Sequence, residues 1–76
     1  MAINYDEVLT TEQKIQILNT RISNLVLEGY QNSIGLKVAK ALENQERIEA
    51  IEEILDIIEA SLRIHNEELT ALSKSD

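Results

Sequence analysis

The second half of the chain carries a regular heptad of apolar positions. Steps of three and four residues alternate from residue 48 to residue 72, which is the spacing of a helix that packs along one seam. Seven of these eight positions hold branched aliphatic side chains and the eighth holds histidine: Ile48, Ile51, Leu55, Ile58, Leu62, His65, Leu69 and Leu72. With Ile48 at heptad position a, more apolar residues fall at positions c and g: Ala50, Ile54, Ile57, Ile64 and Ala71. We therefore predict a helix over residues 47–73 whose apolar arc is too wide for a single neighbouring helix.

The first half begins with the same spacing and then departs from it. Four branched side chains follow the heptad: Ile15, Leu18, Ile22 and Leu25. The next two heptad positions are Gly29 and Asn32, whereas larger apolar side chains continue at steps of four: Val26, Tyr30, Ile34 and Val38. Steps of four move an apolar stripe around a helix, so we expect the seam to change register here. Gly29 costs about 1 kcal/mol relative to alanine inside a helix, which indicates close helix approach or a kink at this point.

Polar residues mark the ends of the two helices. Thr10 and Gln13 have the spacing of a capping box, so we place the first helix at residues 11–43, after an N-terminal arm at residues 1–10. Asn44 can adopt the left-handed conformation that ends a helix, which places the turn at residues 44–46 and a tail at residues 74–76. Two alternatives stay open. The chain can turn within residues 29–35, which are rich in turn formers, or form one continuous helix, since no proline interrupts it.

These patterns predict an all-α protein with a single domain, a coiled-coil-like antiparallel hairpin of two helices. A chain of 76 residues has a small core, and without cysteine it has neither a disulfide nor a Cys/His zinc site to stabilise it. Oligomerisation is the remaining way to stabilise so small a core, so we expect a dimer or tetramer that completes a helical bundle. The expected oligomer interface consists of Ile15, Leu18, Ile22, Leu25, Ile48, Ile51, Ile54, Leu55, Ile57, Ile58, Leu62, Ile64, His65, Leu69 and Leu72.

The first helix carries several residue pairs that, together with the polar break at residues 43–45 and the heptad helix after it, resemble a known pattern. The resemblance rests on Lys14-Ile15, Asn19, Arg21-Ile22 and Gly29-Tyr30. These features are similar to those of small helical-hairpin proteins, of no known activity, encoded by contractile-tailed phages of marine cyanobacteria. The resemblance spans about residues 12–72. It implies a hairpin with its turn near Asn44 and an origin in a phage-infected cell.

Acidic side chains are concentrated in the second half of the chain. The net charge is −7, and residues 39–76, with ten acidic and four basic side chains, carry −6 of it. Six carboxylates lie opposite the apolar arc of the second helix, at heptad positions b, e and f: Glu46, Glu49, Glu52, Glu53, Asp56 and Glu59. This acidic row is interpreted as a solvated face, with a docking face for a basic partner or a divalent-cation site as alternatives. Such a charge disfavours direct binding to nucleic acid.

His65 is the only histidine, and it occupies a seam position between Leu62 and Leu69. We interpret it as a polar residue that fixes helix register, the alternative being a pH switch at a symmetric interface. It is paired with no serine or cysteine in a catalytic motif, and Leu62 stands where a di-iron site would require glutamate. We therefore expect no catalytic residue, no cofactor and no metal.

The expected function follows from the unpartnered apolar surface. We expect a non-enzymatic structural or protein-interaction module that self-associates, and the resemblance adds a phage accessory role. The alternative is an acidic inhibitor that docks on a basic host protein by imitating the charge of nucleic acid. No apolar run reaches the length of a membrane span, so we expect a soluble protein of the cytoplasm, that of the host cell if a phage encodes it.

Overall fold

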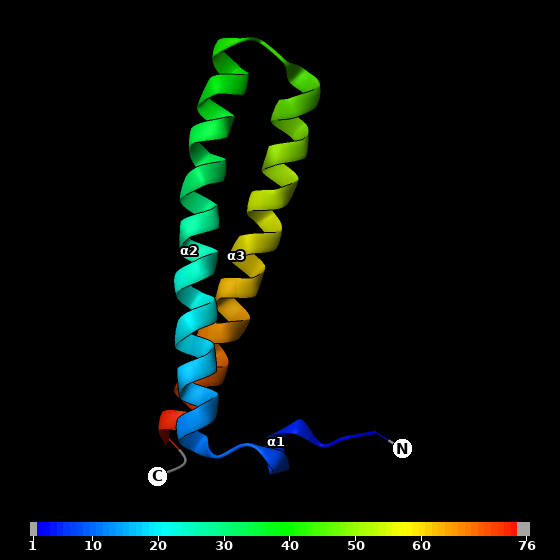
Figure 1. The fold of residues 1–76 in the computed structure, drawn as a ribbon. Coiled ribbons are helices and arrows are strands. Elements are labelled where there is room, and N and C mark those ends of the chain that lie inside the picture. Colours follow the sequence, from blue (N-terminus) through cyan, green and yellow to red (C-terminus); the bar gives the residue numbers. More distant parts are fainter. Residues whose placement is uncertain (1, 75–76) are drawn as a thin grey trace.

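The computed structural model describes residues 2–74 and confirms the predicted all-α hairpin. Within this range the helices are α1 (Tyr5–Val8), α2 (Thr11–Ala41) and α3 (Gln45–Lys74). The two long helices run antiparallel and pack side by side, and the N-terminal arm with α1 projects sideways from the end opposite the turn (Figure 1). The molecule is elongated, with extents of 50 × 28 × 15 Å.

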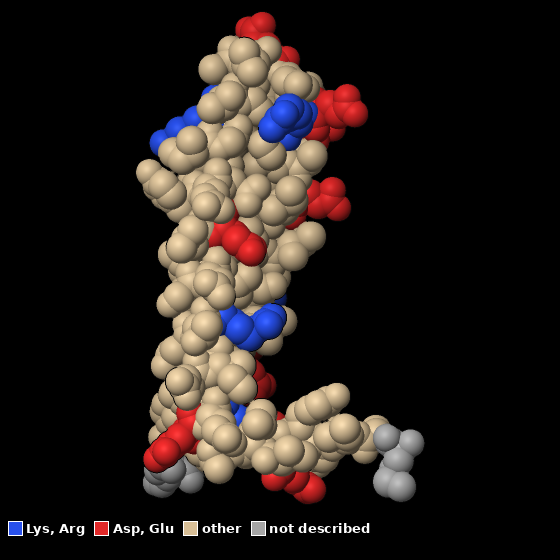
Figure 2. All heavy atoms as spheres, in the orientation of Figure 1, with Lys and Arg blue, Asp and Glu red and all other residues tan. Residues whose placement is uncertain are grey.

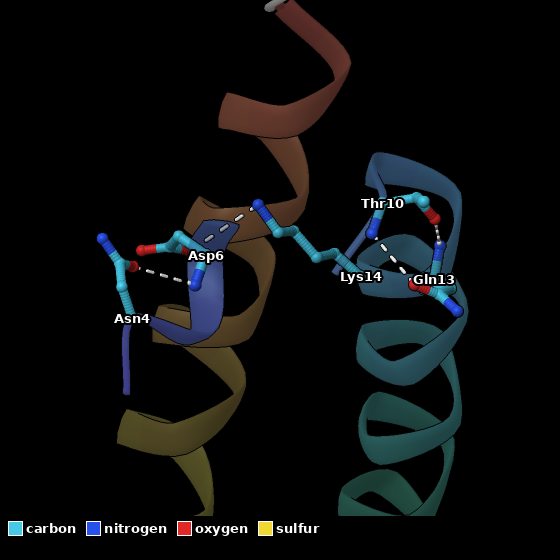
Figure 3. A network of polar contacts seen from close by, with 5 residues as sticks. All are labelled: Asn4, Asp6, Thr10, Gln13 and Lys14. Carbon is cyan, nitrogen blue, oxygen red and sulfur yellow. Dashed lines mark hydrogen bonds and ion pairs between the residues drawn. The ribbon is translucent and has the colours of Figure 1, made fainter. Parts of the chain in front are cut away.

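The start of α2 is the predicted capping box. The Thr10 hydroxyl accepts a hydrogen bond from the backbone N–H of Gln13 at 3.1 Å, and the Gln13 side-chain oxygen accepts one from the N–H of Thr10 at 2.9 Å (Figure 3). Two N–H groups at the start of the helix, which have no acceptor within the helix, are thereby paired. The predicted start of the helix at residue 11 is confirmed.

The chain turns at residues 42–44, so a turn within residues 29–35 and a continuous helix are both wrong. The N–H of Glu43 donates to the Lys40 carbonyl at 3.1 Å and the N–H of Asn44 to the Ala39 carbonyl at 3.0 Å, the two bonds of a Schellman motif. The left-handed residue is Glu43, with φ 54°, and not Asn44 as predicted. The reason is that Asn44 caps the next helix, its side-chain oxygen accepting the N–H of Arg47 at 3.2 Å.

The helix ends differ by one or two residues from the predicted ones. α2 ends at Ala41 and not at residue 43, because the Schellman bonds occupy the last carbonyls. α3 begins at Gln45 and not at residue 47, since Asn44 serves as its cap. At the other end α3 continues through Lys74, one residue beyond the predicted end, and residues 75–76 of the predicted tail lie outside the described residues.

The core is the seam between α2 and α3, and on α3 it follows the predicted heptad. Every one of the eight heptad positions from Ile48 to Leu72 is buried or half-buried. Among the described residues only Ala39, Ile51 and Ile58 are buried, and they are 1%, 8% and 5% exposed. A single pair of helices can cover one face of each partner and no more, which leaves the seam thin.

On α2 the predicted change of register is wrong. The seam continues through the heptad positions Gly29, Asn32, Leu36 and Ala39, all of them buried or half-buried. A Cβ atom built on Gly29 would lie 3.6 Å from Cγ2 of Ile58, so this glycine faces Ile58 across the seam at a distance that leaves room for a Cβ atom. Small side chains on α2 make room for the large isoleucines of α3, so the two helices stay in register although α2 has lost bulk.

Candidate interaction surfaces

The predicted oligomer interface divides into two sets. Most of its residues form the seam between α2 and α3 of one chain and are occupied there: Ile15, Leu18, Ile22, Leu25, Ile48, Ile51, Leu55, Ile58, Leu62, His65, Leu69 and Leu72. The other three, Ile54, Ile57 and Ile64, are 43%, 60% and 54% exposed. This second set is the more exposed part of the predicted interface, whereas most residues of the first set are half-buried.

A larger apolar surface lies on α2, on the side away from α3. Its members, here called the outer stripe, are Val26, Leu27, Tyr30, Ile34 and Val38. Ile34 is two residues from both Asn32 and Leu36, and at about 100° per residue it points away from the seam that those two residues face. Exposed fractions in the outer stripe run from 40% for Ile34 to 68% for Tyr30. The sequence signal for this surface is the four-residue spacing of most of its apolar side chains. We predicted these side chains in the seam, and the structure places them outside it.

His65 pairs within its own chain. Its Nε2 atom lies 2.9 Å from Nε of Arg21, and its Nδ1 atom lies 2.6 Å from the carbonyl oxygen of Ser61. The Arg21 guanidinium can only donate, so Nε2 accepts and Nδ1 carries the proton that it donates to Ser61. This bond joins α2 to α3 at one level of the seam. It supports the interpretation of His65 as a residue that fixes the register of the hairpin. A pH switch at a symmetric interface would involve a second copy of the chain, whereas both hydrogen-bond partners of His65 belong to its own chain.

The acidic row is fully displayed to solvent. All six carboxylates, Glu46, Glu49, Glu52, Glu53, Asp56 and Glu59, are exposed, and Figure 2 shows acidic side chains along the α3 side of the molecule in its upper half. Glu49 accepts a hydrogen bond from the Gln45 amide at 3.3 Å. Among the described residues no lysine or arginine forms an ion pair with the row. Its charge is thus left for solvent ions or a partner.

These carboxylates follow one helix and do not converge on a point. Across residues 2–74 no three His, Cys, Asp or Glu side chains come together as a metal ion would require. None of the helices in that range combines the length and apolar character needed to cross a membrane.

The N-terminal arm contacts the hairpin through Asp6. Asn4 caps α1 through the N–H of Asp6 at 3.2 Å, and a carboxylate oxygen of Asp6 lies 3.8 Å from Nζ of Lys14 (Figure 3). Beside this ion pair is a hollow of about 180 Å³ lined by Asp6, Leu9, Lys14, Ile17, Leu18, Glu68 and Leu72. The arm presents three apolar side chains to solvent, Ile3, Tyr5 and Val8, each at least 62% exposed.

Comparison with protein-family models, with curated proteins and with solved structures finds no match to this chain. The resemblance to phage proteins therefore stays a prediction, and function is argued from the surfaces alone.

Proposed function

We propose that this hairpin is a non-enzymatic structural or protein-interaction module that self-associates. The observation that carries the proposal is the large surface of the single chain. The hairpin exposes 6139 Å², whereas a compact monomer of its mass exposes about 4,700 Å². Its radius of gyration is 16.5 Å, against about 11 Å for a compact domain of this length.

Large apolar side chains contribute to this exposed surface. Thirteen large apolar side chains among the described residues are at least 40% exposed, and three apolar residues are buried. The excess of about 1,400 Å² is more than the roughly 800 Å² per partner that a standard stable interface buries. A second copy of the chain therefore has enough surface to dock on, and apolar patches of this kind mark association sites.

Sedimentation equilibrium over a wide range of chain concentrations tests the proposal. We expect a dimer or tetramer that dissociates on dilution, accompanied by a melting temperature that rises with concentration. A monomer at every concentration, with a cooperative and concentration-independent melt, would overturn it.

We also propose where this module acts. The resemblance to phage proteins supports an accessory role in the cytoplasm of an infected host cell. Fractionation of infected cells tests this, and recovery of the protein outside the cytosolic fraction would contradict it.

A second candidate function is docking on a basic host protein in place of nucleic acid. The observation that favours it is the acidic row, whose six carboxylates are exposed and have no cationic partner in the described part of the chain. A row of like charges raises the local potential and attracts basic clefts.

Charge reversal tests this second function. We expect replacement of Glu49, Glu52, Glu53 and Asp56 by lysine to abolish capture of a basic host protein in a pull-down. The matched control reverses four carboxylates outside the row, Glu12, Glu28, Glu67 and Glu68, and changes the net charge by the same amount. Equal loss in both variants would show that total charge, and not the acidic row, is responsible.

A further inference from the structure

We propose that a second copy of this chain docks on the outer stripe of α2, so that the α2 helices of two hairpins cross between Tyr30 and Ile34. This inference rests on the proposed self-association and names the surface that performs it.

The first argument is the distribution of side-chain size around α2. Between residues 26 and 39 the positions that face α3 include glycine, asparagine and alanine, at Gly29, Asn32 and Ala39. Leu36 also faces α3, but the other large apolar side chains of the same stretch, those of the outer stripe, point away from α3 and are exposed. This stretch of α2 therefore has apolar surface on two sides, of which its own hairpin covers one.

The second argument is charge. Residues 22–42 carry one acidic side chain, Glu28, and two basic ones, Lys37 and Lys40, so two such surfaces meet with little repulsion. The accessible apolar residues of α3 are on the same helix as the acidic row, with Asp56 next to Ile57. Two copies that met through Ile57 would bring the carboxylates beside it, among them Asp56, toward their counterparts, and like charges placed across an interface oppose association. Charge thus favours α2 as the self-docking surface.

The spacing of the outer stripe also indicates the geometry. Val26, Tyr30, Ile34 and Val38 form a ridge of residues four apart. Two such ridges interdigitate when the helices cross at about −50°, the commonest angle of helix packing in globular proteins. In a two-fold symmetric pair the contact is centred midway along the ridge, at the level of residue 32. Side chains near the centre, those of Tyr30 and Ile34, therefore meet their counterparts.

The absence of cysteine from the sequence makes disulfide trapping a direct test of the surface. Ile34→Cys and Tyr30→Cys place a thiol on the outer stripe, and Ile57→Cys and Ile64→Cys are matched controls on exposed positions of α3. Under mild oxidation at equal concentrations we expect the outer-stripe variants to form disulfide-linked dimers at least about tenfold faster, because bridging requires Cα atoms within about 7 Å. Equal or faster linkage at Ile57→Cys or Ile64→Cys would overturn the inference.

A charge inserted into the stripe gives an independent readout. We expect Ile34→Glu to weaken self-association by about 100-fold or more, since a carboxylate would be buried without a partner, and Ile57→Glu to weaken it by no more than about threefold. Both positions face away from the seam, so circular dichroism should show the same helix content in the two variants.

The outcomes separate the two proposals. A wild-type chain that dimerises and is as sensitive to Ile57→Glu as to Ile34→Glu overturns only the outer-stripe surface. A wild-type chain that is monomeric at all concentrations overturns the proposed self-association itself, and leaves the outer stripe to a helix of another protein.

Discussion

The two ends of the hairpin pack in different ways although they share one heptad. Near the termini α2 presents large branched side chains to α3, namely Ile15, Leu18, Ile22 and Leu25. Near the turn its inward residues include Gly29 and Ala39, while α3 offers isoleucine or leucine at every seam position except His65. The buried residues of the described chain, Ala39, Ile51 and Ile58, all belong to the end near the turn.

The difference teaches that depth of burial follows complementarity of size more than the number of apolar residues. Small side chains on one helix let the other helix come close, and its isoleucines are then covered on more sides. Near the termini, where both helices present large side chains, the seam residues stay half-buried. Because small residues of α2 face α3 near the turn, larger apolar side chains of α2 lie on its outer side and form the outer stripe.

The largest effect is expected from Ile58→Ala, which removes a buried side chain from the seam. Ile58 is 5% exposed and lies against Gly29, so the free energy of unfolding should fall by about 3 kcal/mol because a cavity replaces the side chain. Urea denaturation at one fixed chain concentration measures it. The control, Ile57→Ala, changes the adjacent exposed isoleucine and should cost less than about 0.5 kcal/mol. Similar losses in both variants would show that the seam is not the core.

Substitutions of increasing size at Gly29 test the same contact from α2, the helix opposite Ile58. Gly29→Leu should lower the free energy of unfolding by about 2 kcal/mol, since the added side chain must displace Ile58. Gly29→Ala should raise it by about 0.5 to 1 kcal/mol, because the new Cβ would make ordinary contact at 3.6 Å and alanine favours the helix. Thermal melts of the three chains measure the series. Equal stability for leucine and alanine would contradict close approach near the turn.

At the terminal end, Thr10→Ala should destabilise the hairpin by about 1 kcal/mol, because the N–H of Gln13 loses its hydroxyl acceptor. Thr10→Ser keeps the acceptor and should restore most of the stability. Thr11→Ala, one residue later, is the control and should have little effect. Chemical denaturation followed by circular dichroism distinguishes the three, and an equal loss at Thr11 would argue against a specific cap.

The smallest effect is expected at the turn. Glu43→Gly should raise the free energy of unfolding by about 0.5 to 1 kcal/mol, because glycine adopts the positive φ of this position without strain. The same substitution inside α3, Glu53→Gly, should lower it by about 1 kcal/mol. Calorimetry on both variants checks the opposite signs. A loss in both would show that the left-handed turn is not populated in solution.

Local signals in the sequence predicted a large part of this structure. The capping box at Thr10, the heptad of α3 and a turn close to Asn44 all depend on residues near one another in the chain, and each is present. The left-handed residue was misplaced because Asn44 suits two roles, ending one helix and starting the next, and its side chain can fill only one of them. The heptad assigned to an oligomer interface is a seam within one chain, because periodicity identifies a face to be covered and not the molecule that covers it.

By itself the sequence determined that this chain forms two amphipathic helices, where the first begins, and that most of the charge gathers on the second. These properties come from the order of residues along single helices, and no distant contact is needed to set them. Only the tertiary structure decided which face of α2 meets α3. Both faces near the turn carry a periodic pattern, and the closer fit of isoleucine against glycine and alanine selects the one with small side chains. The larger apolar face is thereby left outside.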